Sequence, residues 1–188
     1  MADGAADRQN NIFTIPNLLS AFRLLLVPVI AWLYCGRGDY PLTAGVLLLS
    51  GATDIADGFI ARRFHMVSDL GKVLDPIADK LTQTAALICL LTRFPAIWWL
   101  LGVLVMKETV MAVMGLLVIR RTGAVYSAAW HGKLATCVLY AVILAHIVWY
   151  AIPQPVSAVL VLAGAASILL SLVLYTIADL RRIRAGRS

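Results

Sequence analysis

Five aspartates lie within the 26 residues from Asp54 to Asp79, in a chain that is otherwise apolar enough for a lipid bilayer. An aspartate near the centre of a bilayer costs about 2.5–3.5 kcal/mol on insertion scales. Several of them would prevent insertion unless they share cations or line a hydrated cavity. Hydrophobic residues make up 61% of the chain and charged residues 14%, which excludes an ordinary soluble domain. The aspartates therefore need a chemical role within a membrane protein.

Six apolar stretches are long enough to cross a bilayer as helices. They lie near residues 17–36, 40–60, 73–92, 95–119, 132–152 and 155–178, and the acidic segment interrupts the second and third. The sequence thus predicts an all-α integral membrane protein, a single domain over residues 1–188 with six transmembrane helices. Residues 1–10 lack the features of a signal peptide and are expected to form a flexible lead. Residues 181–188 are expected to form a basic tail that touches anionic lipid.

The distribution of arginines between the apolar stretches indicates the orientation of the chain. With a cytoplasmic N-terminus, nine arginines lie on the cytoplasmic side and only Arg37 and Arg93 lie opposite. The positive-inside rule therefore predicts that both termini are cytoplasmic. The acidic segment, at the end of the second stretch and the start of the third, is then expected to open into a cytoplasm-facing polar cavity. A bacterial cell membrane is the expected location.

The spacing of the aspartates predicts a metal site. Asp54 and Asp57 are three residues apart, and Asp75 and Asp79 are four apart, so each pair occupies one face of a helix. Two such helices can place their carboxylates opposite each other. Oxygen ligands from two rigid elements are typical of Mg²⁺ or Mn²⁺, and no histidine or cysteine stands at these positions to suggest zinc.

The acidic segment in full reads D-x2-D-G-x2-A-R-x8-G-x3-D-x3-D. This pattern of eight fixed residues resembles the signature of the CDP-alcohol phosphatidyltransferases, integral membrane enzymes of phospholipid synthesis. The segments NIFTIPNLLSAFRLLLVPV and LDPIADK are similar to the branch containing phosphatidylglycerophosphate synthases and eukaryotic-type cardiolipin synthases. The resemblance covers residues 11–80 and is diffuse beyond them. It implies transfer of a phosphatidyl group from CDP-diacylglycerol to an acceptor hydroxyl, with release of CMP.

The resemblance also implies roles for individual residues. Asp54, Asp57, Asp75 and Asp79 would hold one or two metal ions, and Asp79 would also be the general base. The positions expected to contact CDP-diacylglycerol are Asn17, Gly58, Arg62, Ser68 and Gly71. A glycine allows close approach of a ligand, and the alternative for Gly58 and Gly71 is helix packing. An arginine can bind a pyrophosphate through two hydrogen bonds, and the alternative for Arg62 is membrane anchoring.

Three basic residues within or beside the apolar stretches are candidates for binding the acceptor: Arg23, Lys107 and Lys133. By resemblance, they would hold the phosphate of glycerol 3-phosphate. The alternative is that Arg23 or Lys107 pairs with Glu108 or with an aspartate of the cluster. In many phosphatidylglycerophosphate synthases, the position of Lys107 is an arginine and another arginine follows about two turns later. At that later position, around Gly115, this chain is apolar. Phosphatidylglycerol, the acceptor of cardiolipin synthases, therefore remains an alternative.

A divalent-cation transporter is the alternative outside the enzymes, because aspartates within membrane helices also build ion pathways. Two features favour the enzyme. The acidic residues gather on one side of the membrane, and Gly58 and Arg62 supply anion-binding groups that a cation pathway does not need. The intact motif also disfavours an inactive scaffold. The resemblance implies a homodimer, and no nucleic-acid partner is expected.

Overall fold

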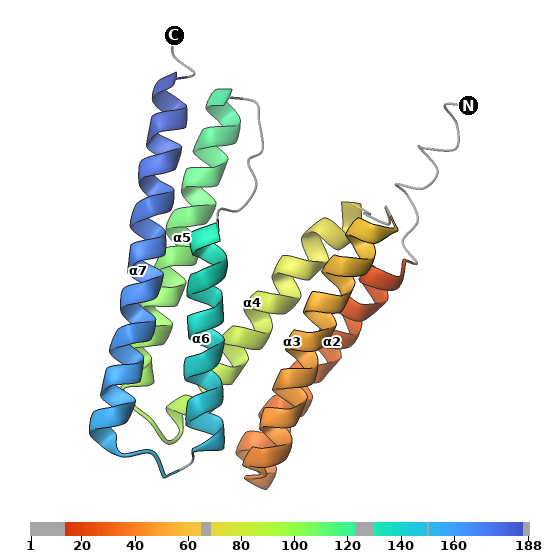
Figure 1. Cartoon of the computed structure of the whole chain (residues 1–188), viewed down its shortest axis with the longest axis vertical. Coiled ribbons are helices and arrows are strands. Elements are labelled where there is room, and N and C mark those ends of the chain that lie inside the picture. Colours follow the sequence, from red (N-terminus) through yellow and green to blue (C-terminus); the bar gives the residue numbers. More distant parts are fainter. Residues whose placement is uncertain (1–13, 65–68, 123–129, 150, 186–188) are drawn as a thin grey trace. The chain divides into compact units, whose positions relative to one another are not determined.

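The computed structural model describes residues 14–64, 69–122, 130–149 and 151–185. In these ranges the chain forms six α-helices and one short π-helix, without strands. The chain divides into two compact units, Met1–Thr92 and Arg93–Ser188, and each consists of three antiparallel α-helices (Figure 1). The predicted all-α architecture is confirmed.

The first unit contains α2 (Ile15–Ala31), the π-helix η1 (Trp32–Arg37), α3 (Tyr40–Arg63) and α4 (Asp69–Leu91). Helix α2 packs against both α3 and α4. From Asn17 onward its buried residues recur every three or four positions and so form one stripe along the helix. The buried residues of α2 are Pro16, Asn17, Ser20, Arg23, Leu26 and Ile30. The N-terminal half of this stripe is polar, and it faces the neighbouring helices rather than the exterior.

Local sequence explains where these helices begin and end. The Thr14 hydroxyl accepts a hydrogen bond from the Asn17 amide at 3.4 Å and caps the start of α2. The chain leaves η1 at Gly38, whose φ of 63° is a left-handed conformation that favours glycine. Asp39 then caps α3 by accepting a hydrogen bond from the Leu42 amide at 3.1 Å. Two residues thus reverse the chain between the two helices.

The second unit contains α5 (Ile97–Thr122), α6 (Trp130–Val148) and α7 (Gln154–Ala185), and α7 packs against the other two. Gly132 of α6 lies so close to Tyr175 of α7 that an added Cβ would stand 2.5 Å from the phenolic oxygen. At the other end of α6, the buried ring of His146 is within 2.9 Å of the Ser157 hydroxyl. Small and polar residues therefore hold α6 and α7 together at both ends.

Four segments are long and apolar enough to cross a membrane: Ile15–Arg37, Tyr40–Ala61, Ile97–Arg121 and Gln154–Ile183. Segment Gly132–Val148 is apolar but shorter, and α4 carries the second half of the acidic motif. Large apolar side chains point outward from both units, such as Leu25, Ile55 and Leu162. Because water would disfavour such an exterior, the protein is an integral membrane protein, as predicted. The observed helices match the six predicted stretches in order and approximate extent.

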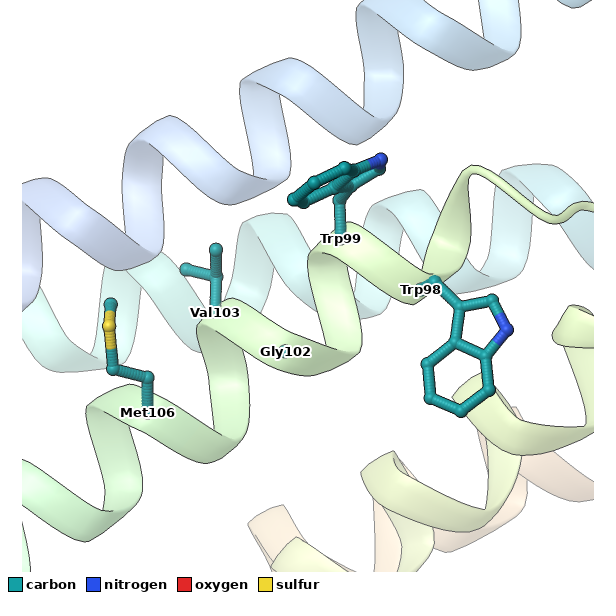
Figure 2. A pocket seen from close by; sticks show the side chains of 5 residues that line it. All are labelled: Trp98, Trp99, Gly102, Val103 and Met106. Carbon is teal, nitrogen blue, oxygen red and sulfur yellow. The ribbon is translucent and has the colours of Figure 1, made fainter.

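The exterior of α5 carries an apolar groove of about 410 Å³. Figure 2 shows its lining: Trp98, Trp99, Gly102, Val103 and Met106. None of these residues carries a charge or a nucleophile. The groove therefore belongs to the apolar exterior of the second unit, whereas the acidic motif lies in the first unit.

Candidate active site

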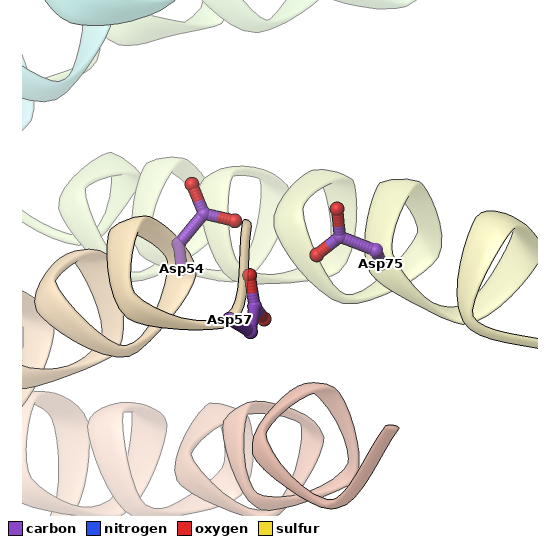
Figure 3. Close-up of side chains that lie close together, drawn as sticks. All are labelled: Asp54, Asp57 and Asp75. Atoms are coloured by element: carbon purple, nitrogen blue, oxygen red, sulfur yellow. The ribbon is translucent and has the colours of Figure 1, made fainter. Parts of the chain in front are cut away.

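Three carboxylates of the acidic motif meet between α3 and α4. Asp54 and Asp57 project from one face of α3, and Asp75 projects toward them from α4 (Figure 3). One oxygen from each of the three lies within 4.8 Å of the other two. Asp57 is only 3% exposed, whereas the side chains of Asp54 and Asp75 are 43% and 46% exposed. The cluster thus has a buried floor and two solvent-accessible sides.

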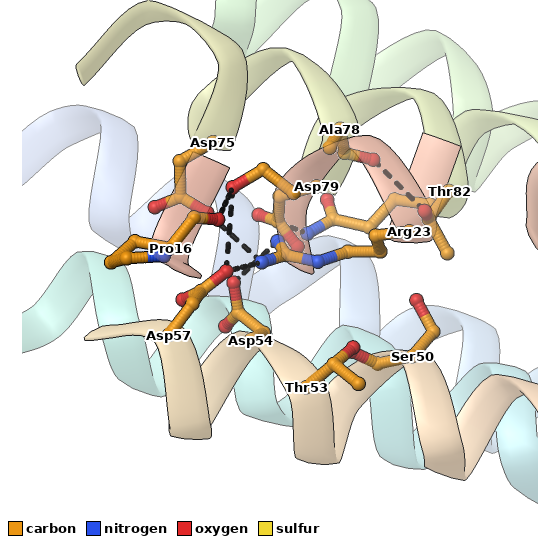
Figure 4. Close-up of polar contacts among 12 residues, drawn as sticks. Pro16, Arg23, Ser50, Thr53, Asp54, Asp57, Asp75, Ala78, Asp79 and Thr82 are labelled. Atoms are coloured by element: carbon orange, nitrogen blue, oxygen red, sulfur yellow. Dashed lines mark hydrogen bonds and ion pairs between the residues drawn. The ribbon is translucent and has the colours of Figure 1, made fainter. Parts of the chain in front are cut away.

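The guanidinium of Arg23, from α2, lies among these three carboxylates (Figure 4). Its Nη1 donates to Asp54 at 2.5 Å. Its Nη2 donates both to Asp57 and, at 3.0 Å, to Asp75. Arg23 is 1% exposed, and its Nε has no hydrogen-bond partner among the residues that the structure describes. One buried cation therefore bridges all three acidic side chains.

The chemistry of this group fits a divalent metal ion. Hard cations such as Mg²⁺ and Mn²⁺ select carboxylate oxygens, and Mg²⁺ binds them at about 2.0–2.1 Å. Two ligands on opposite sides of such an ion stand about 4 Å apart, which is close to the spread of these three oxygens. Three carboxylates against one guanidinium also leave the cluster with an excess of negative charge. Asp54, Asp57 and Asp75 could therefore hold a cation with small side-chain movements.

Asp79 follows Asp75 by one helical turn and shares its face of α4. The Gln83 side chain donates a hydrogen bond of 2.9 Å to the Asp79 carboxylate, one turn further along. Gln83 is itself buried. Asp79 is not one of the three carboxylates whose oxygens lie within 4.8 Å of one another. Gln83 of the same helix thus helps to orient the Asp79 carboxylate.

Sequence reasoning missed two residues that support the carboxylates, Ser20 and Gln83. The Ser20 hydroxyl is within 3.1 Å of the Pro16 carbonyl oxygen and 3.4 Å of Asp57 Oδ2. A signal was present in both cases. Ser20 stands three residues before Arg23, and Gln83 stands four residues after Asp79, so each shares a helix face with a charged site residue.

The structure positions part of the expected CDP-diacylglycerol set. Asn17 is buried in the first turn of α2, Gly58 directly follows Asp57 in α3, and Gly71 lies in the first turn of α4. Ser68 and the side chain of Arg62 lie outside the described residues. The binding roles of all five residues remain predictions.

The three basic residues expected at the acceptor site are not equivalent in the structure. Arg23 pairs with aspartates of the cluster, and Lys107 of α5 pairs with Glu108 at 2.8 Å. These are the alternative pairings that the sequence had left open. Lys133 lies exposed in the first turns of α6. Lys107 and Lys133 belong to the second unit and Arg23 to the first.

Comparisons with known proteins cover most of the chain. The family model for CDP-alcohol phosphatidyltransferase matches residues 13–177, across both units. A Bacillus subtilis CDP-diacylglycerol–glycerol-3-phosphate 3-phosphatidyltransferase is 36% identical over 140 residues, which cover 66% of this chain and 72% of that protein. A Streptomyces coelicolor cardiolipin synthase (CMP-forming) is 40% identical over 111 residues, or 56% of this chain.

A third relative, a Schizosaccharomyces pombe cardiolipin synthase (CMP-forming) and mitochondrial hydrolase fusion protein, is 50% identical over 86 residues, or 45% of this chain. The chain spans 14% of this fusion protein and 51% of the Streptomyces protein. The chain therefore corresponds to only part of the length of these two relatives.

Proposed function

The chain belongs to the CDP-alcohol phosphatidyltransferase family, and from this membership we propose that it transfers a phosphatidyl group from CDP-diacylglycerol to an acceptor hydroxyl and releases CMP. The observation that carries the proposal is the cluster of Asp54, Asp57 and Asp75 with its buried cation. Packing of helices in lipid does not require buried charges, which are costly there. An enzyme of phosphoryl transfer can use such carboxylates to hold a metal ion.

We propose that Asp54, Asp57, Asp75 and Asp79 hold Mg²⁺ or Mn²⁺. The spread of the first three carboxylates and their position on two facing helices support this assignment. When bound, the metal would neutralise the charge that develops on the leaving CMP. The half-exposed sides of Asp54 and Asp75 leave the cluster open to a substrate phosphate.

Asp79 is proposed as the general base that takes the proton of the acceptor hydroxyl. Its carboxylate stands one turn from Asp75 and is oriented by Gln83. Asn17, Gly58 and Gly71 lie on the three helices around the cluster and are proposed, with Arg62 and Ser68, to contact CDP-diacylglycerol. The two glycines would let the nucleotide or the pyrophosphate approach the helices closely, and Arg62 would bind the pyrophosphate.

Glycerol 3-phosphate is proposed as the acceptor. Arg23, Lys107 and Lys133 would bind its phosphate, and the similarity to the Bacillus CDP-diacylglycerol–glycerol-3-phosphate 3-phosphatidyltransferase supports this choice. Arg23 could take this role only if it leaves the carboxylates, and Lys107 only by sharing itself with Glu108. Phosphatidylglycerol is the second candidate, supported by the Streptomyces relative's name and by the apolar surroundings of Gly115.

The chain is a multi-pass membrane protein of this family. Within that frame we propose a bacterial cell membrane, cytoplasmic termini, a polar cavity that opens to the cytoplasm beside the aspartates, and a homodimer. The positive-inside distribution of arginines supports the orientation. The lipid tails of the donor would then stay in the bilayer while its headgroup reacts at the cytoplasmic side.

CMP release by the purified protein tests this function. The reaction contains CDP-diacylglycerol with Mg²⁺ or Mn²⁺, and either glycerol 3-phosphate or phosphatidylglycerol as acceptor. Release with glycerol 3-phosphate supports the proposal, whereas release only with phosphatidylglycerol makes the protein a cardiolipin synthase. No release with either acceptor, together with metal uptake into proteoliposomes, would favour the transporter.

Variants in the second unit separate the two acceptors further. Lys107→Met is expected to raise the KM for glycerol 3-phosphate and to leave the KM for CDP-diacylglycerol unchanged, because it removes a cation for the acceptor phosphate. Glu108→Gln is the matched control, since it frees Lys107 from its ion pair. An unchanged acceptor KM in Lys107→Met would exclude this residue from the acceptor site.

A further inference from the structure

Arg23 stands where the proposed metal site needs a cation. Its two terminal nitrogens contact Asp54, Asp57 and Asp75, the same carboxylates whose oxygens converge within 4.8 Å. We propose that Arg23 is a built-in counter-cation that neutralises the cluster in the metal-free protein and that an incoming divalent ion displaces. This inference rests on the proposed function, because it takes the aspartates as metal ligands.

Geometry makes the two cations alternatives. A Mg²⁺ ion must approach its carboxylate oxygens to about 2.1 Å and demands near-octahedral geometry. One oxygen of each of the three carboxylates already accepts a hydrogen bond from the guanidinium, and Nη2 is shared between Asp57 and Asp75. A divalent ion and a guanidinium this close would also repel each other strongly in a partly buried site. Metal binding therefore requires Arg23 to withdraw from at least part of the cluster.

Burial explains why the metal-free protein needs such a cation. Asp57 is 3% exposed and Arg23 is 1% exposed, so neither charge can be stabilised by bulk water. Without Arg23, the buried Asp57 would keep only the 3.4 Å contact with the Ser20 hydroxyl among its side-chain partners in the described part of the chain. An unpaired buried carboxylate is strongly unfavourable. Arg23 thus holds α2, α3 and α4 together when no metal is present.

Displacement also connects the metal to the acceptor. A guanidinium released from the carboxylates remains a buried cation and needs another anion. The Nε of Arg23, which has no partner in the cluster, is a further donor for such a group. A phosphate bound beside the metal would satisfy this requirement. Metal binding would then precede tight binding of a phosphate-bearing acceptor, because the metal frees the arginine that receives it.

The direction in which removal of Arg23 changes the affinity for the metal distinguishes a displaceable counter-cation from a permanent structural support. If Arg23 competes with the metal, its removal strengthens metal binding. If Arg23 positions the carboxylates while the metal is bound, its removal weakens metal binding. Mn²⁺ is a suitable probe, because electron paramagnetic resonance measures its free concentration directly.

The experiment titrates Mn²⁺ into metal-stripped, full-length protein in nanodiscs. The proteins are wild type, Arg23→Met, which removes the charge but keeps a long side chain, and Arg23→Lys, which keeps the charge with a single donor group. Arg23→Met is expected to bind Mn²⁺ at least about tenfold more tightly than wild type. Arg23→Lys is expected to lie between them, because an ammonium cannot bridge three carboxylates as the guanidinium fork does. Equal or weaker binding by both folded variants overturns the proposal.

Thermal unfolding provides the second measurement. Arg23→Met is expected to unfold at a lower temperature than wild type in EDTA. Saturating Mn²⁺ is expected to raise its unfolding temperature by more than that of wild type. If a variant does not stay folded without metal, it is purified with Mn²⁺ and its affinity is measured by competition with a chelator. Tighter Mn²⁺ binding than in wild type is again expected, and an affinity no higher than that of wild type contradicts the proposal.

A metal-ligand variant separates this inference from the proposed function. Asp75→Asn is expected to weaken Mn²⁺ binding in the wild-type background and in the Arg23→Met background. If wild type binds no Mn²⁺, or binds it equally well after Asp75→Asn, the metal site itself fails and the inference fails with it. If Asp75→Asn weakens binding but Arg23→Met does not strengthen it, only the inference is overturned.

Discussion

The unequal burial of the two aspartates on α3 predicts that they differ in their contribution to stability. Asp57 is buried and paired with Arg23, whereas the side chain of Asp54 is 43% exposed and paired with the same arginine. Replacing either by asparagine keeps the volume and removes the charge. In the buried position this change removes a hydrogen bond between charged groups worth about 1.5–3 kcal/mol. In the half-exposed position the loss is about 0–1 kcal/mol.

These free energies translate into measurable temperatures. For a chain of 188 residues, 1 kcal/mol corresponds to a shift in Tm of about 2–4 °C. Asp57→Asn should therefore lower the Tm by about 3–12 °C, and Asp54→Asn should lower it less, by about 0–4 °C. Both proteins are measured in the same detergent with EDTA, so that no divalent ion compensates for the lost charge. In parallel, both variants should lose CMP release, because both aspartates are proposed metal ligands.

Equal losses of Tm in the two variants would contradict the reasoning from burial. So would a larger loss for Asp54→Asn. Retained CMP release in Asp54→Asn, with its stability unchanged, would remove this residue from the proposed metal site while leaving the argument about stability intact.

Asp79→Asn should lower kcat by about 10²–10⁴-fold with little change in Tm, because the amide can still pair with Gln83; substantial residual CMP release would exclude Asp79 as the base. Gly132→Ala should destabilise the protein by about 1–3 kcal/mol, because the new methyl group would meet Tyr175, and thermal unfolding measures this loss. Gly115→Ala is its control, since nothing lies within 4 Å of the added atom, and an equal loss of Tm there would refute the packing argument. EDTA should abolish CMP release and added Mg²⁺ or Mn²⁺ should restore it; activity that persists in EDTA would contradict a metal-dependent reaction.

Much of the architecture could be predicted from local sequence. The lengths of the apolar stretches predict the six helices, and capping residues such as Asp39 explain their boundaries. The spacing of the aspartates predicts that Asp54 shares a helix face with Asp57, and Asp75 with Asp79, because the period of a helix places residues three or four apart on one face. That the two faces lie opposite each other was an expectation that spacing alone does not decide, and Asp79 is not among the three carboxylates that converge. The structure confirms that these three carboxylates meet. The binding roles of Asn17 and Gly58 remain predictions, because no local rule identifies a ligand.

The position of Arg23 illustrates what local sequence leaves open. The sequence placed it with Lys107 and Lys133 as a cation for the acceptor and kept pairing with an aspartate as an alternative. Its carboxylate partners lie 31, 34 and 52 residues away along the chain. No periodicity connects residues at such distances. The contact of Ser20 with Asp57 likewise spans 37 residues, although its place on the same helix face as Arg23 was visible in the sequence.

By itself, the sequence determined a helical membrane protein with a carboxylate motif, because hydrophobic length and helical period are properties of short segments. Only the tertiary structure decided which charges meet. The packing of α2 against both α3 and α4 buries Asp57 and brings Arg23 into contact with all three carboxylates. The physical reason is that a buried charge must find an opposite charge, and packing between helices decides which one is within reach.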